Sequence, residues 1–244
     1  HDGAVSRTMR VGLEGAGTVG EGASKRRQRV LDAAGGRCAA VTELGLVVRA
    51  AGAGRRLGGL AKALLTDAGG DSFLAAVVAR ARGAAVRDSD IVVVIGAPHD
   101  GAVAAEARRL GVAVAVNPAP GRGMGSSVAL GFTAAAGFAG GVVAALLWPV
   151  DVPAVATDTL AVLRRRAAAE LVVVPTFAHR GGHPIAVGRA CWAAMEQAGA
   201  LPEGARSVLR GLGPAVVRVA VDDAAIRADV DDPDDLAALR GGAR

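Results

Sequence analysis

The sequence predicts an α/β fold, with three α/β/α layers around a mostly parallel, Rossmann-like sheet,. From residue 44 onward, short valine-rich runs that are apolar on both faces alternate with longer stretches of helical periodicity. Such runs are typical of parallel strands that are buried on both sides. Hydrophobic residues make up 52% and charged residues 21% of the 244 positions, which is the composition of a globular protein,.

The order of the elements follows from this alternation. Six strands are predicted, at residues 44–50, 91–95, 112–116, 142–147, 171–175 and 216–221. Seven helices are predicted, at residues 72–85, 101–110, 126–136, 155–169, 189–197, 206–212 and 233–239. Asp100 suits a helix N-cap, and Pro233 suits a first helical turn,. Ligands of such sheets bind beyond the carboxyl ends of the strands, so polar residues directly after each strand are the functional candidates.

Residues 44–244 form the predicted catalytic domain, and residues 1–43 form an N-terminal extension that we expect to be mobile or peripheral. The extension contains GAGTVG at residues 15–20, which matches the G-x-G-x-x-G of dinucleotide sites and favours an NAD(P)-dependent oxidoreductase,. The acid of that pattern would be Glu43, about 28 residues after the motif begins, where ~20 is usual,. Because no convincing apolar helix follows the motif, we expect a peripheral turn here.

Composition argues against several classes of partner. The net charge is +5, but the basic residues are scattered and aromatics are only 2%, so we expect no nucleic-acid partner,. No charge-free apolar run reaches the ~18 residues of a membrane span, and residues 1–10 show no signal-peptide core,. Cys38 and Cys191 are isolated, so we expect neither a disulfide framework nor a zinc site, and a cytoplasmic location,.

A second glycine-rich stretch, AAGAGRRLGGLAK at residues 50–62, follows the first predicted strand. Glycines let backbone N–H groups approach phosphate oxygens, while Arg56 and Lys62 add positive charge, so the stretch has the chemistry of an anion cradle,. It is not a P-loop, because no G-K-[ST] follows. On the glycines alone, a plain connection with solvated arginines is an equal alternative.

This stretch resembles the L-A-A-G-x-S-x-R-M-G…K signature of the molybdenum-cofactor nucleotidyltransferase family, which contains cytidylyl- and guanylyltransferases. Five further motifs follow in the family's order. They are the N-P…G-M-x-x-S pattern at residues 117–131, P-V-D-V-P at 149–153, V-P-T-F…R-G-G-H-P at 174–184, G-A-R at 204–206 and D-V-D-D-P-D-D-L at 229–236. Together they cover about residues 44–240.

The resemblance implies a fold of the nucleotide-diphospho-sugar transferase type and a Mg²⁺-dependent reaction, with Mn²⁺ as a substitute. CMP would pass from CTP to the phosphate of molybdopterin, and pyrophosphate would be released. Catalysis is assigned to Lys62, Arg56 and Asp151, and metal binding to Asp151 and Asp231. His183 and Arg180 would bind the second substrate. The implied nucleotide-binding residues are Ala50, Ala51, Gly52, Gly54, Arg56, Lys62, Asn117, Ser126 and Ser127.

Several of these positions have a structural alternative. Asp151 and Asp231 also suit helix caps or turns, and Asn117 also suits the turn before Pro118,. One of Ser126 and Ser127 is explained equally well by capping, and His183 by the Gly-Gly-His-Pro turn,.

The sequence departs from the family pattern at three positions. Arg49 stands where the first strand usually carries Leu, Gly54 where Ser is usual, and Ala61 where Pro or Asp is frequent. The AAG triplet is closer to the cytidylyl branch, whereas G-G-L-A-K is closer to the guanylyl pattern. The choice of CTP or GTP and a different phosphate acceptor therefore stay open. So do two other classes: the oxidoreductase, and a non-catalytic carrier that delivers the cofactor to a molybdenum hydroxylase.

Overall fold

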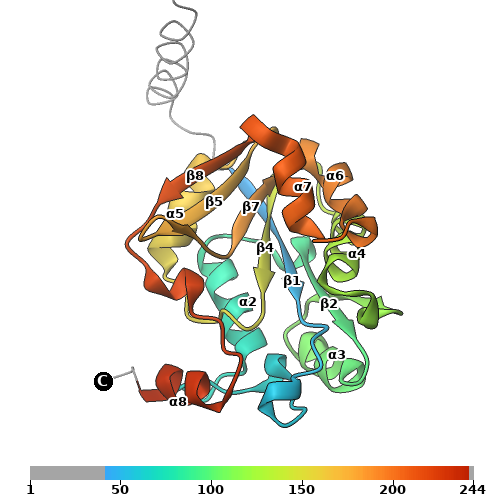
Figure 1. The fold of residues 1–244 in the computed structure, drawn as a ribbon, viewed down its shortest axis with the longest axis vertical. Helices are drawn as coiled ribbons and strands as arrows, with labels where there is room; N and C mark the ends of the chain where they lie inside the picture. The colour runs from blue at the N-terminus through green and yellow to red at the C-terminus, as the bar shows by residue number, and fades with distance from the viewer. Residues whose placement is uncertain (1–41, 242–244) are drawn as a thin grey trace, which may run out of the picture. The chain divides into compact units, whose positions relative to one another are not determined.

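The computed structural model describes residues 42–241, so GAGTVG at residues 15–20 lies outside the described part of the chain. Its centre is an eight-stranded sheet in the order β3-β2-β1-β4-β7-β5-β6, with β8 paired to β5 (Figure 1). The strands are β1 (Glu43–Arg49), β2 (Ile91–Gly96), β3 (Ala113–Asn117), β4 (Val142–Pro149), β5 (Val172–Phe177), β6 (Arg180–Gly181), β7 (Ile185–Gly188) and β8 (Val216–Ala220).

The sheet is mostly parallel, as the sequence predicts. Strands β1, β2, β3 and β4 run parallel to one another, and β5 is parallel to β8. β7 is antiparallel to both β4 and β5, and β6 is antiparallel to β5. All six predicted strands are present, but β6 and β7 were not predicted. They are only two and four residues long, too short to give a periodic signal beside a Gly-Gly-His-Pro turn.

Helices cover both faces of the sheet and complete the three predicted layers (Figure 1). On one face lie α2 (Phe73–Gly83), α3 (Asp100–Arg109) and α5 (Thr157–Arg166); on the other lie α4 (Met124–Ala135), α6 (Trp192–Glu196) and α7 (Ala205–Leu212). The last helix is α8 (Pro233–Gly241). Asp100 is the first residue of α3 and not its N-cap, a position that belongs to His99.

Two apolar cores, one on each face of the sheet, hold the layers together. Along β1, Leu46 and Val48 pack toward α2 and α5, whereas Val47 packs toward α4, as the alternation of a strand requires,. The largest fully buried side chains include Trp148 and Phe132. Burying a side chain of this size stabilises the fold by roughly 1.5–3 kcal/mol. With so few aromatics, valine, alanine and leucine supply most of both cores.

The carboxyl ends of β1, β2 and β4 point to the same edge, which is the lower edge in Figure 1. Two 3₁₀ turns follow β1 at this edge, η2 (Arg55–Leu57) and η3 (Lys62–Leu64), and the segment before α8 comes close to them. Within residues 42–241, the helices are all too short or too polar to cross a membrane.

Candidate functional site

The glycine loop after β1 is folded tightly onto itself. Gly54 has a φ of 58°, and its carbonyl oxygen accepts hydrogen bonds from the N–H groups of Leu57 (2.9 Å) and Gly59 (3.0 Å). A Cβ atom at Gly54 would lie 1.8 Å from the carbonyl oxygen of Leu60. Only glycine fits this conformation of the loop,. The fold of the loop delivers Arg56 and Lys62 to the carboxyl edge of the sheet.

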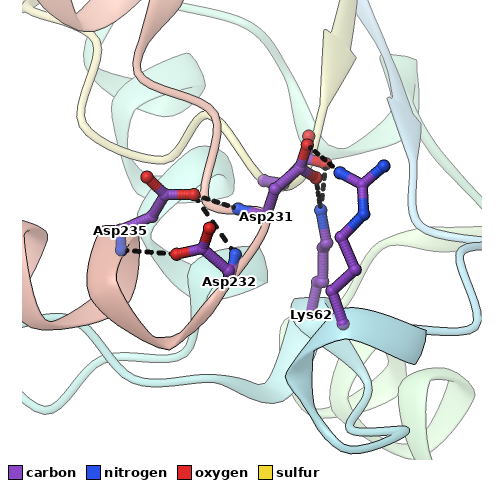
Figure 2. Close-up of polar contacts among 6 residues, drawn as sticks. Lys62, Asp231, Asp232 and Asp235 are labelled. Carbon is purple, nitrogen blue, oxygen red and sulfur yellow. Dashed lines mark hydrogen bonds and ion pairs between the residues drawn. The ribbon is translucent and has the colours of Figure 1, made fainter.

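Lys62 connects two carboxylates that are far apart in the sequence. Its Nζ atom lies 2.8 Å from Asp151 Oδ2 and 2.5 Å from Asp231 Oδ1. Asp151 directly follows β4, and Asp231 precedes α8. The guanidinium of Arg56 completes the cluster, with Nη1 3.1 Å from the other oxygen of Asp231. Figure 2 shows Lys62 and Asp231 pointing toward one another from their separate segments.

Neither carboxylate caps a helix, although Asp151 does lie in a turn after β4. The start of α8 is closed by the side chains of Asp232 and Asp235 (Figure 2). They accept hydrogen bonds from the backbone N–H groups of residues 231, 232, 234 and 235. The start of α5 is held by Asp223, which accepts from Ala156 N and Thr159 Oγ1. The side chains of Asp151 and Asp231 are therefore available to bind cations.

The two cations of the cluster balance its two carboxylates. Burial opposes the charge of Lys62, but hydrogen bonds with Asp151 and Asp231 outweigh it, and the pKa of Lys62 is raised,. The hydrogen bond from Lys62 lowers the pKa of Asp231, and Arg56 adds to this effect. The lysine side chain is 15% exposed and that of Asp151 24% exposed, whereas Arg56 is 76% exposed. Lys62 and Asp151 thus form the sheltered part of the cluster.

The two carboxylates fit a divalent cation. Their oxygens already converge on a single cation, the ammonium of Lys62. Mg²⁺ is commonly held by one or two carboxylates together with substrate phosphates. No group of three or more His, Cys, Asp or Glu side chains within residues 42–241 could hold a metal by itself. A metal bound here would therefore take part of its ligands from a phosphate substrate or from water.

Asn117, Ser126 and Ser127 lie together at the end of β3 and the start of α4. Asn117 Nδ2 donates to the hydroxyls of Ser126 (2.9 Å) and Ser127 (3.0 Å), and its Oδ1 accepts from Ala119 N. Asn117 and Ser127 are buried. These bonds favour a turn-shaping role for Asn117. Because α4 begins at Met124, the two serines lie within its first turn.

A cavity of about 910 Å³ lies beside the cluster, over β4, β5 and β7. Arg49 and His183 line it, together with the loop 123–125 and the segment 198–206. Gly125 and Gly204 pack against each other in the wall of the cavity. A Cβ on Gly125 would also lie 2.3 Å from the carbonyl oxygen of Ala198. The G-M-G and G-A-R motifs are thus in direct contact. Arg180 is exposed on β6 and does not line the cavity.

His183 is held rigidly in the cavity wall. Its backbone N–H donates to the carbonyl oxygen of Ile226 at 2.7 Å. Burial and the nearby guanidinium of Arg49 lower the pKa of His183 to about 4, against opposing effects of Asp151 and a hydrogen bond with the Leu147 backbone. The imidazole is therefore neutral at pH 7, and its Nδ1 is buried without a hydrogen-bond partner in residues 42–241.

Four further cations that line the cavity were not predicted from the sequence: Arg122, Arg206, Arg210 and Arg218. Arg218 could have been recognised as a candidate from the sequence, because it is a charged residue inside the predicted strand at residues 216–221. Arg206 belongs to the G-A-R motif, but the motif alone gives no side-chain direction. Nothing in the sequence marks Arg122, which lies in the 3₁₀ turn η5 (Pro120–Arg122).

The fold and the cluster at its carboxyl edge define a nucleotidyltransferase. More particularly, the chain belongs to the MobA-like NTP transferase domain family, whose model matches residues 46–219. The match spans most of the described residues and includes the glycine loop, Asp151 and His183. Comparison with curated proteins finds no match.

Solved structures agree with this assignment. The chain is similar to Rv0371c from Mycobacterium tuberculosis H37Rv, with a TM-score of 0.66 and 25% identity over 82% of this chain and 98% of that one. A homologue of that protein from Mycobacterium sp. strain JC1 gives 0.63 and 27% over 82% and 96%. Rv0371c has also been solved as a complex with manganese, at 25% identity and a TM-score of 0.64 over 82% and 99%.

The molybdopterin-guanine dinucleotide biosynthesis protein A from Archaeoglobus fulgidus shares the fold, with a TM-score of 0.59 and 17% identity over 81% of this chain and 97% of that chain. These likenesses confirm the predicted nucleotide-diphospho-sugar transferase type of fold.

Proposed function

We propose that this protein transfers CMP from CTP to the phosphate of molybdopterin, with Mg²⁺ as the cofactor and pyrophosphate as the second product. The observation that carries the proposal is the convergence of Asp151, Asp231 and Lys62 at the end of the glycine loop. The Ala50-Ala51-Gly52 triplet supports CTP as the donor, since it is closer to the cytidylyl pattern. Molybdopterin as the acceptor is supported by the similarity to the Archaeoglobus molybdopterin-guanine dinucleotide biosynthesis protein A. A molybdenum hydroxylase is the proposed recipient.

The residues of the cluster have distinct tasks in this reaction. Negative charge accumulates on the leaving pyrophosphate, and cationic groups that neutralise it lower the barrier. Asp151 and Asp231 would hold Mg²⁺, which supplies charge neutralisation on the triphosphate. The ammonium of Lys62 and the exposed guanidinium of Arg56 would contact the phosphates of the NTP and neutralise part of their charge,. Backbone N–H groups of residues 51–54 would bind the nucleotide, whereas that of Ala50 donates to Val94 O,.

A guanylyltransferase is the second candidate, because G-G-L-A-K in the loop is closer to that pattern. The acceptor could equally be another phosphate ester, since the cluster acts on the donor. The alternative of an NAD(P)-dependent oxidoreductase depends on residues 15–20, which lie outside the described residues. A non-catalytic cofactor carrier would bind its ligand at the cluster of Lys62, Asp151 and Asp231 without turnover.

A pyrophosphate-release assay separates these functions. The full chain is incubated with molybdopterin, Mg²⁺ or Mn²⁺, and each of the four NTPs in turn. We expect the highest turnover with CTP, and a loss of about 100-fold or more in Asp151→Asn, because a metal carboxylate is removed. Asp158→Asn is the matched control, since Asp158 is exposed in the first turn of α5.

Each other outcome indicates a different function. Turnover that is highest with GTP would indicate the guanylyltransferase. Binding of CTP without turnover would favour the carrier. NADPH binding without NTP binding would favour the oxidoreductase and refute the proposal.

A further inference from the structure

The cavity beside the cluster carries more positive charge than its own residues neutralise. Five arginines line it, and Glu203 is the single acidic lining residue among residues 42–241. Glu203 is already paired, with Oε2 2.7 Å from Arg210 Nη1. The other four have no ion pair or side-chain hydrogen bond within the described chain: Arg49, Arg122, Arg206 and Arg218. The cavity therefore suits an anionic ligand.

Arg49 is the most informative of the four, because it is the least exposed of them. It ends β1 in register with Val94 on β2 and Pro149 on β4, in the middle of the sheet. Burial lowers the pKa of Arg49, and the charge of Asp151 opposes this effect. A guanidinium that is desolvated without a partner destabilises the folded protein. An anion that enters the cavity would relieve this cost.

The position of Arg49 links the cavity to the reaction centre. Its carbonyl oxygen accepts a hydrogen bond from Val150 N at 3.0 Å, directly before Asp151. The unpartnered Nδ1 of His183 lies in the wall of the same cavity. The charge of Asp151 acts on both Arg49 and His183, so a ligand held by Arg49 would lie near the carboxylate that is proposed to bind the metal.

The cavity also has an apolar part. Met124 and Leu201 line it, and their side chains are 72% and 38% exposed. They are two of the four large hydrophobic residues that are exposed in residues 42–241. Exposed apolar side chains at the rim of a charged pocket indicate a ligand with an apolar or planar body attached to its anionic group.

We propose that this cavity binds the acceptor as a phosphate monoester with an apolar or planar body, and that Arg49 holds the phosphate that attacks the nucleotide. This inference rests on the proposed function. A guanidinium matches a phosphate because two of its N–H groups can donate to two phosphate oxygens at once. No residue of the family pattern assigns this role, since that pattern has leucine at the position of Arg49.

The chemical step balances with the residues present. An oxygen of the acceptor's phosphate dianion forms a bond to the α-phosphorus of the NTP. The bond between the α-phosphorus and the α,β-bridging oxygen breaks, and that oxygen leaves with its electron pair as part of pyrophosphate. The attacking oxygen of a phosphate dianion carries no proton, so the step needs no base. Arg49 and Arg218 leave the remaining phosphate oxygens neutralised while the nucleophile approaches.

The test measures binding of phenyl phosphate by calorimetry to the full chain, with benzoate as the carboxylate comparison and CTP with Mg²⁺ as the donor. We expect phenyl phosphate to bind about tenfold or more tightly than benzoate, and Arg49→Leu to weaken it by about tenfold or more. CTP affinity should change by less than about twofold. The affinity of Arg49→Lys for phenyl phosphate should lie between those of the wild type and Arg49→Leu. Lysine keeps the positive charge but loses the paired N–H donors of the guanidinium. Arg165→Leu, an exposed arginine away from the cavity, is the matched control.

Thermal unfolding gives an independent measurement. Because Arg49→Leu removes a desolvated charge, we expect its Tm to rise by about 2–4 °C while phenyl phosphate binding falls. A lower Tm would assign Arg49 a structural role and overturn the proposal. The proposal would also be overturned if Arg49→Leu bound phenyl phosphate as tightly as the wild type does, or if the variant lost only its binding of CTP. If wild type binds CTP but not phenyl phosphate, only this inference fails; if it binds neither, the proposed function fails as well.

Discussion

At the scale of single residues, the site depends on side chains whose hydrogen bonds are satisfied by groups far away in the sequence. Lys62 is 89 residues from Asp151 and 169 from Asp231. The sequence identified each of the three as a candidate, but only their contact shows that neither carboxylate serves as a cap. His183 shows the same effect, since its lowered pKa comes from burial and from Arg49 across the sheet edge.

The lowered pKa of His183 predicts how stability varies with pH. The pKa of this histidine is about 6.5 in the unfolded chain and about 4 in the folded protein. Between these values the unfolded state binds more protons, so the free energy of unfolding falls as the pH is lowered from 6.5 to 4,. The contribution is up to about 3 kcal/mol.

Urea denaturation at several pH values measures this effect. His183→Gln should flatten the curve in that window, and substitution of the exposed His179 by Gln is the control. An unchanged slope in His183→Gln would mean that another group titrates.

At the scale of elements, the loop 50–62 shows how a short connection positions two cations. The N–H group of Ala50 donates to the carbonyl oxygen of Val94 at 2.8 Å, which ties the start of the loop to β2. Gly54 then reverses the chain in a conformation that L side chains rarely adopt,. The approach of Leu60 to Gly54 closes the loop and directs Lys62 to the carboxylates.

Gly54→Ala is expected to disrupt this loop, because the new Cβ would collide with Leu60 O. We expect the free energy of unfolding to fall by roughly 1–3 kcal/mol and the affinity for CTP with Mg²⁺ to fall with it. Urea denaturation and calorimetry measure the two quantities. Gly52→Ala is the control within the same loop, because a Cβ there meets nothing within 4 Å. Equal effects of both substitutions would contradict the role given to Gly54.

At the scale of the whole molecule, the sheet collects the site from segments along most of the described chain. The parallel strands β1 and β4 bring the glycine loop and Asp151 to one edge. The N–H group of Val230 donates to Asp151 O at 2.8 Å, which brings the segment before α8 to the same place. The antiparallel β7 inserts between β4 and β5 and places His183 over the cavity.

The predicted boundary between an extension and the catalytic domain can be tested by truncation. β1 begins at Glu43, which pairs with Val142, and Thr42 O accepts a hydrogen bond from Arg164. A chain that starts at residue 42 is expected to keep its Tm within about 3 °C and its CTP affinity within about twofold. Thermal unfolding and calorimetry check this expectation. A large loss of either would show that residues 1–41 belong to the catalytic unit.

The sequence by itself determined the layers, the six long strands and the motif residues, because these depend on local periodicity and on side-chain chemistry. Only the tertiary structure decided which charges meet. Pairing of β1 with β4 joins Lys62 to Asp151, and the short strand β7 escaped prediction because its partners are non-local. The role of Arg49 was likewise decided by the tertiary structure. In the sequence it only departs from the family pattern, whereas in the fold it lies between two paired strands and lines the cavity. Contacts of this kind depend on strand order, which no local pattern encodes.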